Sequence, residues 1–139
     1  MLRLRPELAT ALLAASVLAG AVACSGSGSQ TINACPGCNL TTYAAAYRTA
    51  LTNGFQSPPV TFTATGQTAT VQVNQVQNGA SAPYTGSVSG SFAAPCSAAT
   101  VQNGAAGSGQ VTVTSMASGD CTLMLTGAPF TIGVQVHVP

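Results

Sequence analysis

Cysteine is the residue type in this chain whose spacing most directly suggests chemistry. Five cysteines are present: Cys24, Cys35, Cys38, Cys96 and Cys121. The first of them directly follows an apolar, leader-like segment, and the other four form an even set. An exported chain folds in an oxidising compartment, where paired thiols become disulfides. The sequence therefore predicts two disulfides and one cysteine with a separate role.

Three disulfide connectivities are open for the four downstream cysteines. We favour the pairs Cys35 with Cys38 and Cys96 with Cys121. The second pair would close a loop of about 26 residues and would stabilise the fold by roughly 3–4 kcal/mol in the chain-entropy description.

Cys35-Pro36-Gly37-Cys38 also has the C-x-x-C spacing of thiol-disulfide exchange proteins. Those proteins place the motif at a helix N-terminus in a βαβ unit, which lowers a thiol pKa. No βαβ pattern follows here, and Pro-Gly is an ordinary turn pair, so we interpret the motif as a structural turn.

A zinc site built from the four cysteines would need a second closely spaced pair of cysteines and a reducing compartment. We therefore expect no metal and no other cofactor.

Few side chains beyond residue 24 can carry a charge: Arg48, Asp120 and His137, apart from cysteines, tyrosines and termini. One Arg cannot neutralise the phosphates of a nucleic acid, so that class of partner is excluded. Hydrolysis by paired carboxylates needs two acids. A Ser-His-Asp triad is conceivable, but His137 alternates with two valines on the polar side of a strand and Asp120 sits in a turn. We expect both to be solvated surface residues and the protein to lack catalytic activity.

The N-terminal segment has the features of an export signal. Arg3 and Arg5 give a positive start, and the apolar run Leu8 to Ala19 is too short to span a membrane as a mature helix. Ala21-Val22-Ala23-Cys24 resembles a lipobox, with Ala21 at a position where Leu is commonest. This resemblance implies a signal peptide over residues 1–23 and an acylated Cys24 that anchors a lipoprotein. The alternative is ordinary signal peptidase cleavage at the same bond, which would release a secreted protein with a free thiol.

Residues 24–34 contain Ser25-Gly-Ser-Gly-Ser29 and are expected to form a flexible tether. In Gram-negative lipoproteins, an Asp directly after the acylated cysteine favours retention in the inner membrane. The presence of Ser25 therefore implies an outer-membrane location, on either face.

Residues 35–56 are expected to hold the C-x-x-C turn and a short helix between Asn39 and Asn53. Ala44, Ala45 and Ala46 favour a helix. Tyr43, Tyr47 and Leu51 recur at i, i+4 and i+8, which would place them on one helix face.

Residues 57–139 change to a two-residue period of Thr, Val and small side chains, divided by Gly, Pro, Asn and Ser. This pattern predicts an all-β antiparallel sandwich of about seven strands. The expected strands are Val60 to Thr65, Thr68 to Val76, Tyr84 to Phe92, Ser97 to Val101, Gln110 to Met116, Cys121 to Thr126 and Phe130 to Val138.

Several of these segments resemble bacterial immunoglobulin-like domains. They are Ala64 to Val73, Tyr84 to Phe92, Gly109 to Thr114, Gly119 to Thr126 and Val134 to Val138. The chain departs from antibody domains in its cysteine positions and in having no Trp. The resemblance implies a non-enzymatic lipoprotein with a structural or adhesive domain. The alternatives are an extracytoplasmic module that binds a glycan or protein and, less favoured, a C-x-x-C thiol-disulfide protein.

Overall fold

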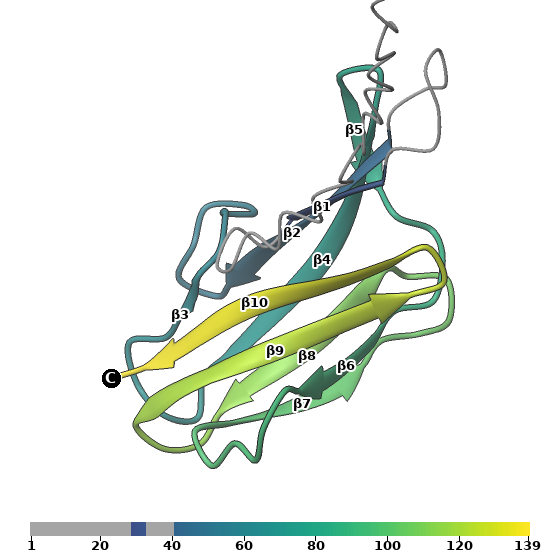
Figure 1. Ribbon diagram of the computed structural model, residues 1–139. Coiled ribbons are helices and arrows are strands. Elements are labelled where there is room, and N and C mark those ends of the chain that lie inside the picture. The colour runs from purple at the N-terminus through teal and green to yellow at the C-terminus, as the bar shows by residue number, and fades with distance from the viewer. Residues whose placement is uncertain (1–28, 33–40) are drawn as a thin grey trace, which may run out of the picture.

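The computed structural model describes residues 29–32 and 41–139, which form two β-sheets packed face to face (Figure 1). The strands are β1 (Ser29–Ile32), β2 (Thr41–Thr49), β3 (Val60–Thr61), β4 (Thr68–Gln77), β5 (Ala80–Pro83), β6 (Ser89–Phe92), β7 (Ala99–Asn103), β8 (Gln110–Ser115), β9 (Gly119–Gly127) and β10 (Phe130–Val138). In these residues, no helix is long and apolar enough to cross a membrane.

Strand order identifies the fold. One sheet runs β1-β2-β4-β8-β7, with β5 added to β4, and the other runs β3-β10-β9-β6. Every strand pair is antiparallel except β3, which is parallel to β10. The series β2-β4-β8-β7 and β6-β9-β10 match strands A-B-E-D and C-F-G of the immunoglobulin fold in both sequence and spatial order. The predicted Ig-like sandwich is therefore confirmed.

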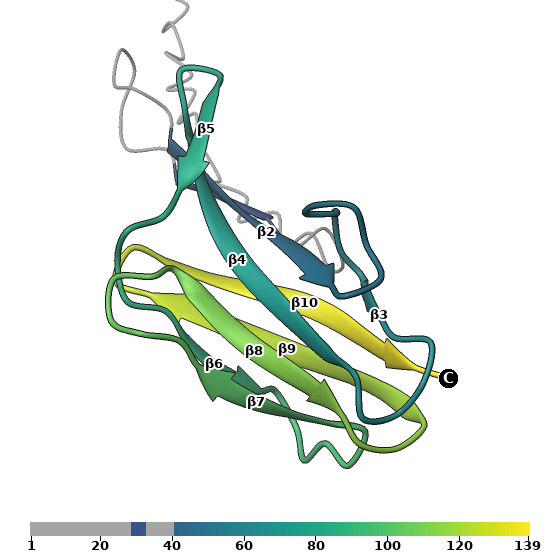
Figure 2. The same ribbon diagram turned by 180° about the vertical axis from the view of Figure 1, so that it is seen from behind.

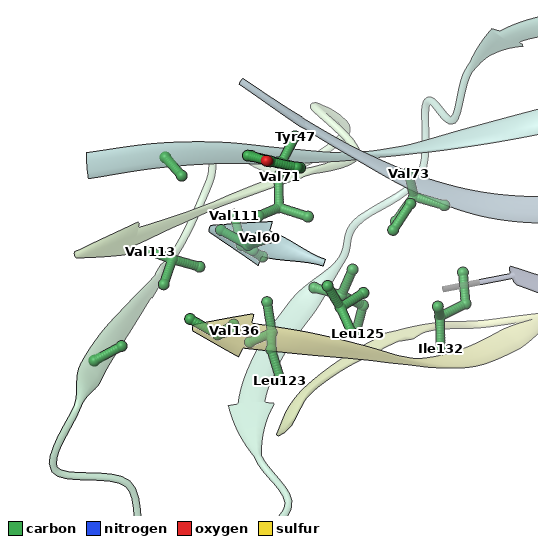
Figure 3. Close-up of a cluster of buried hydrophobic side chains, with 14 of the residues drawn as sticks. Tyr47, Val60, Val71, Val73, Val111, Val113, Leu123, Leu125, Ile132 and Val136 are labelled. Atoms are coloured by element: carbon green, nitrogen blue, oxygen red, sulfur yellow. The ribbon is translucent and has the colours of Figure 1, made fainter. Parts of the chain in front are cut away.

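Alternating side chains fill the space between the sheets (Figure 3). In β10 every second residue from Phe130 to Val138 is buried, and β8 buries Val111 and Val113 in the same way. Within the same layer, Val71 of β4 lies beside Val111, and Leu123 and Leu125 of β9 lie beside the residues of β10. A fully buried Val or Leu contributes about 1.5–3 kcal/mol relative to an exposed one, so this layer supplies the main driving force for folding.

The short helix expected between Asn39 and Asn53 is wrong, because Thr41–Thr49 forms strand β2. Tyr43, Ala45 and Tyr47 are buried, which is a two-residue period. The i, i+4 spacing of the two tyrosines fits a strand face as well as a helix face. Leu51, the third residue of the supposed helical stripe, is 71% exposed in the loop after β2.

The sheet extends further toward the N-terminus than residue 57, where the sequence placed its beginning. Both β2 and β1 belong to it, and β1 lies inside the segment expected to be a tether. Of the expected strand Val60 to Thr65, only Val60 and Thr61 pair, and of Tyr84 to Phe92 only the last four residues pair.

Hairpin β4–β5 extends beyond the body of the sandwich (Figure 2). Asn78 and Gly79 form its turn with φ values of 52° and 80°, as expected for an Asn-Gly pair in a two-residue hairpin. An aromatic cluster lies at its base: the Tyr43 ring stacks on Phe130 at 4.8 Å between centroids, and Tyr84 meets both rings edge-on. These contacts join the hairpin to the start of β10.

Ser115 closes the loop between β3 and β4. Its side chain is completely buried, and its hydroxyl donates a hydrogen bond to the carbonyl of Ala64 (2.9 Å) and accepts one from the backbone N–H of Gln67 (3.0 Å). The Gln67 side-chain carbonyl in turn accepts from the N–H of Thr63 at 2.9 Å. These bonds hold the chain in a loop where the sequence predicted a longer strand.

Candidate functional site

Asp120 and His137 are the candidate acid–base residues, and the β9–β10 hairpin places them side by side. Its turn pairs Gly127 with Phe130, and this register carries through to Asp120 opposite His137. His137 Nδ1 lies 2.6 Å from Asp120 Oδ1, a distance at which Nδ1–H donates a hydrogen bond to the carboxylate. The side chains are 50% and 74% exposed respectively.

This pair has the His–Asp half of a catalytic triad but lies on the open outer face of a sheet. Ser118, the serine nearest to the pair in sequence, donates its hydroxyl to the carbonyl oxygen of Pro139 at 2.8 Å. Across residues 29–32 and 41–139, no three His, Cys, Asp or Glu side chains form a metal-binding group. An exposed pair of this kind contributes about 0–1 kcal/mol to stability. Both side chains are exposed, as the sequence predicted, but Asp120 lies in strand β9 and not in the expected turn, because it pairs with His137.

The predicted disulfide between Cys96 and Cys121 is confirmed, with its Cα atoms 5.9 Å apart. It links the segment between β6 and β7 to β9, and both cysteines pack partly buried against the core. The N–H of Ala99 donates a hydrogen bond to Cys96 Sγ at 3.3 Å. We therefore assign the bridge a role in stabilising the fold. The other predicted site residues, Cys24, Cys35 and Cys38, lie outside the described residues.

A shallow hollow of about 200 Å³ lies beside the disulfide. Its lining residues are Ala93, Ala94, Pro95, Asp120, Cys121, Thr122 and Gln135. Two of these residues bond to each other: the Gln135 amide donates a hydrogen bond to the Thr122 hydroxyl at 3.0 Å. The lining thus carries one carboxylate among small and neutral groups.

A larger open hollow of about 480 Å³ lies where the beginning of β6, the end of β7 and the β9–β10 turn meet. Ser87, Ser89, Asn103 and Thr126 contribute its polar side chains. The Asn103 carbonyl oxygen accepts a hydrogen bond from the N–H of Gly90 at 2.8 Å, which joins the edges of the two sheets. Hydroxyl and amide groups in a hollow are suited to hydrogen bonding with an uncharged ligand. Sequence patterns did not indicate this site, because three separate segments build it.

Arg48, expected on a helix, instead lies on the outer face of β2. Its guanidinium carbon is 5.1 Å from the ring centroid of Phe55, within the range of a cation–π interaction. Phe55 is 41% exposed and was not singled out from the sequence. Its contact with Arg48 depends on the loop after β2, which returns to the strand where Gln56 bonds to Tyr47.

Comparison with known proteins adds one structural similarity. No family model matches the chain, and no curated protein matches it. Among solved structures, domains 4 and 5 of the S-layer protein SbsC are similar, with 22% sequence identity and a TM-score of 0.47. That alignment covers 85% of this chain and 79% of the SbsC chain. The assignment of the Ig-like fold rests on strand order and register.

Proposed function

We propose that this protein is a non-enzymatic lipoprotein, held in the outer membrane by an acylated Cys24, whose Ig-like sandwich has a structural or adhesive role. The observation that carries the proposal is the position of β1. This strand begins at Ser29, five residues after the expected lipidation site, and pairs with β2 at the edge of the sandwich. The folded domain thus starts close to the point of attachment, as suits a module displayed at a membrane.

The outer face of the larger sheet supports a role in neutral, non-catalytic contacts. Gln110 donates a side-chain hydrogen bond to Gln72, and Gln72 donates one to Asn74, each at 3.2 Å. Around this ladder, Thr70 and Thr112 sit on the same face of the sheet. Gln72 itself is only 6% exposed, so the groups that this face offers are the amides of Gln110 and Asn74 and the hydroxyls of Thr70 and Thr112 rather than charges. Amides and hydroxyls hydrogen bond to peptide or sugar partners without electrostatic steering.

Cell fractionation of the Cys24→Ala variant tests the anchor. The wild-type protein is expected in the outer-membrane fraction, and the variant is expected in the soluble fraction with an unchanged melting temperature. A variant that stays in the membrane fraction would contradict anchoring through Cys24.

Beads coated with the extracted lipoprotein test adhesion. We expect the coated beads to cluster or to be captured by the producing cells. If coated beads behave like uncoated beads, the adhesive role is contradicted.

A second candidate function is binding of an extracytoplasmic ligand such as a glycan. The hollow lined by Ser87, Ser89, Asn103 and Thr126 favours it. A glycan array probed with the wild-type protein and with Asn103→Asp tests this alternative, because the substitution places a charge in the hollow. Hits that the variant loses would support binding there, and an array without hits would exclude it.

Thiol-disulfide exchange by Cys35 and Cys38 is the less favoured alternative. Reduction of insulin by the purified protein, with Cys35→Ser as the control, would support that role. Absence of turnover would exclude it.

A further inference from the structure

One edge of β2 brings together the N-terminal strand and the loop that follows β2. The opposite edge of β2 is bonded along its whole length to β4. On the free edge, β1 pairs with Thr41 to Ala44, and further along Gln56 exchanges two backbone hydrogen bonds with Tyr47, of 2.8 and 2.7 Å. The start of the described chain and residues 50–56 therefore occupy the same side of the sandwich, visible beside β2 in Figure 1.

Chain length limits how far this side can lie from an anchor at Cys24. Ser29 follows Cys24 by five positions in the sequence, and a fully extended chain of that length spans at most about 17 Å. Ser29 pairs with Ala44, which is five residues before the end of β2 and so about 17 Å along the strand from Thr49. A lipid on Cys24 thus holds the β2 edge, rather than the opposite edge at β7, near the bilayer.

The loop on this edge exposes apolar side chains. Leu51 is 71% exposed and Phe55 is 41% exposed, and Met116 is the third exposed large hydrophobic residue within residues 41–139. Bonds between Thr52 and Thr49 shape the loop: the Thr49 N–H donates to the Thr52 hydroxyl at 3.0 Å. The two apolar side chains are thus presented on a turn of defined shape.

Arg48 completes this surface. Its guanidinium packs on the ring of Phe55, so its position is coupled to that of the loop. Leucine and phenylalanine beside an arginine match the chemistry of a bilayer interface, where apolar groups enter the acyl boundary and a cation remains among the phosphates.

We propose that this surface, consisting of the β1 edge, Arg48, Leu51 and Phe55, lies against the lipid bilayer. The inference rests on the proposed acylation of Cys24. The lipid and the loop then form two points of contact along one edge, so the sandwich lies on its side. Strands β6 and β7, with the hollow between them, face away from the membrane and remain open to partners.

Single tryptophans test the orientation, since the chain has no Trp of its own. Phe55→Trp places an indole in the loop, and Thr100→Trp places one at an exposed position of β7, on the opposite edge. Each acylated variant is reconstituted into vesicles of phosphatidylethanolamine and phosphatidylglycerol with brominated acyl chains. The Phe55→Trp variant is expected to shift its emission to the blue and to lose roughly half of it, since an interfacial side chain lies within about 5–10 Å of the headgroup boundary. The Thr100→Trp variant is expected to show neither change.

Equal quenching of the two variants, or no quenching of either, would overturn the orientation. Co-flotation with the vesicles and the intact mass of the same samples report on acylation independently, so loss of the anchor and loss of the orientation give different results. A further substitution, Leu51→Asp, in the Phe55→Trp protein is expected to reduce quenching at least twofold, whereas the matched Met116→Asp is expected to leave it unchanged. Similar effects of both aspartates would also contradict the proposal.

Discussion

Cys96 and Cys121 form a disulfide that connects the segment after β6 with β9, and Val136 of β10 lies directly opposite Cys121 in the register. In antibody domains the conserved bridge joins the B and F strands across the core. Here the bridge starts instead from the segment between the C-type and D-type strands. The backbone of this segment is hydrogen bonded near its two ends, from the Ala93 N–H to the Thr122 carbonyl and from the Met116 N–H to the Ala98 carbonyl, and the disulfide adds a covalent link between those ends.

Replacing Cys121 with Ser should therefore lower stability. We expect the free energy of unfolding to fall by about 3–4 kcal/mol, the value for a loop of this length, and one additional thiol, that of Cys96, to become titratable in denaturant. Urea unfolding and thiol titration measure the two effects, and Cys96→Ser with Cys121→Ser controls for the new thiol. A thiol count equal to that of the parent would refute the pairing.

Replacing Ser115 is expected to reduce the free energy of unfolding more than replacing an exposed serine of the sandwich. Ser115→Ala removes the buried hydroxyl that binds Ala64 and Gln67, and it leaves the Ala64 carbonyl and the Gln67 N–H, whose hydrogen bonds are partly buried, without that partner. The expected loss is about 1–3 kcal/mol in the free energy of unfolding. Ser91→Ala, at an exposed position of β6, is the matched control and should change stability by at most about 0.5 kcal/mol. Equal effects of the two substitutions would contradict the role of the hydroxyl.

Substitutions at two glycines with positive φ separate the cost of backbone strain from the cost of a steric collision. Gly66 has φ +78° and open space where a Cβ would point, whereas a Cβ on Gly109, with φ +64°, would collide with the carbonyl oxygen of Tyr84. Gly66→Ala should cost about 1–2 kcal/mol, the penalty for an L-residue in the left-handed region. Gly109→Ala should cost clearly more, because the chain must also move away from Tyr84. Melting curves of both variants measure this, and similar losses would show that the collision is relieved without cost.

The Asp120–His137 pair should be nearly neutral for stability. A double-mutant cycle with Asp120→Ala and His137→Ala is expected to give a coupling energy below about 1 kcal/mol, because water screens both side chains. Chemical denaturation of the four proteins measures it. A coupling of several kcal/mol would mean that the pair is shielded in solution by another part of the protein.

Strands were predictable from the sequence where apolar and polar residues alternate and no helical pattern competes, as in the residues from Ile132 to Val138. The strand β2 was not, because Tyr43 and Tyr47 satisfy a period of two and a period near four at once, and Ala44 to Ala46 favour a helix locally. Tertiary pairing with β4 decided between the two. For β5, the Asn78-Gly79 pair was a sufficient turn signal that the strand assignment did not use.

The features of the candidate sites also divide into those that the sequence could predict and those that it could not. The number of cysteines left three connectivities open, and the favoured one contained the bridge between Cys96 and Cys121 that the structure has. The contact of Asp120 with His137 follows from the β9–β10 hairpin register, and so a hairpin assignment would have supplied it. The contact of Arg48 with Phe55 and the hollow near Asn103 depend on loops whose paths no local pattern determines.

The intact mass of the protein extracted from bacterial membranes, measured before and after reduction, tests the central claim most directly. A mass equal to residues 24–139 plus acyl groups, lower by four hydrogens before reduction, is the predicted result: a lipid on Cys24 and two disulfides. A mass of residues 24–139 without acyl groups, recovered from the medium, would contradict the anchor. It would describe a secreted Ig-like protein with a free thiol at Cys24.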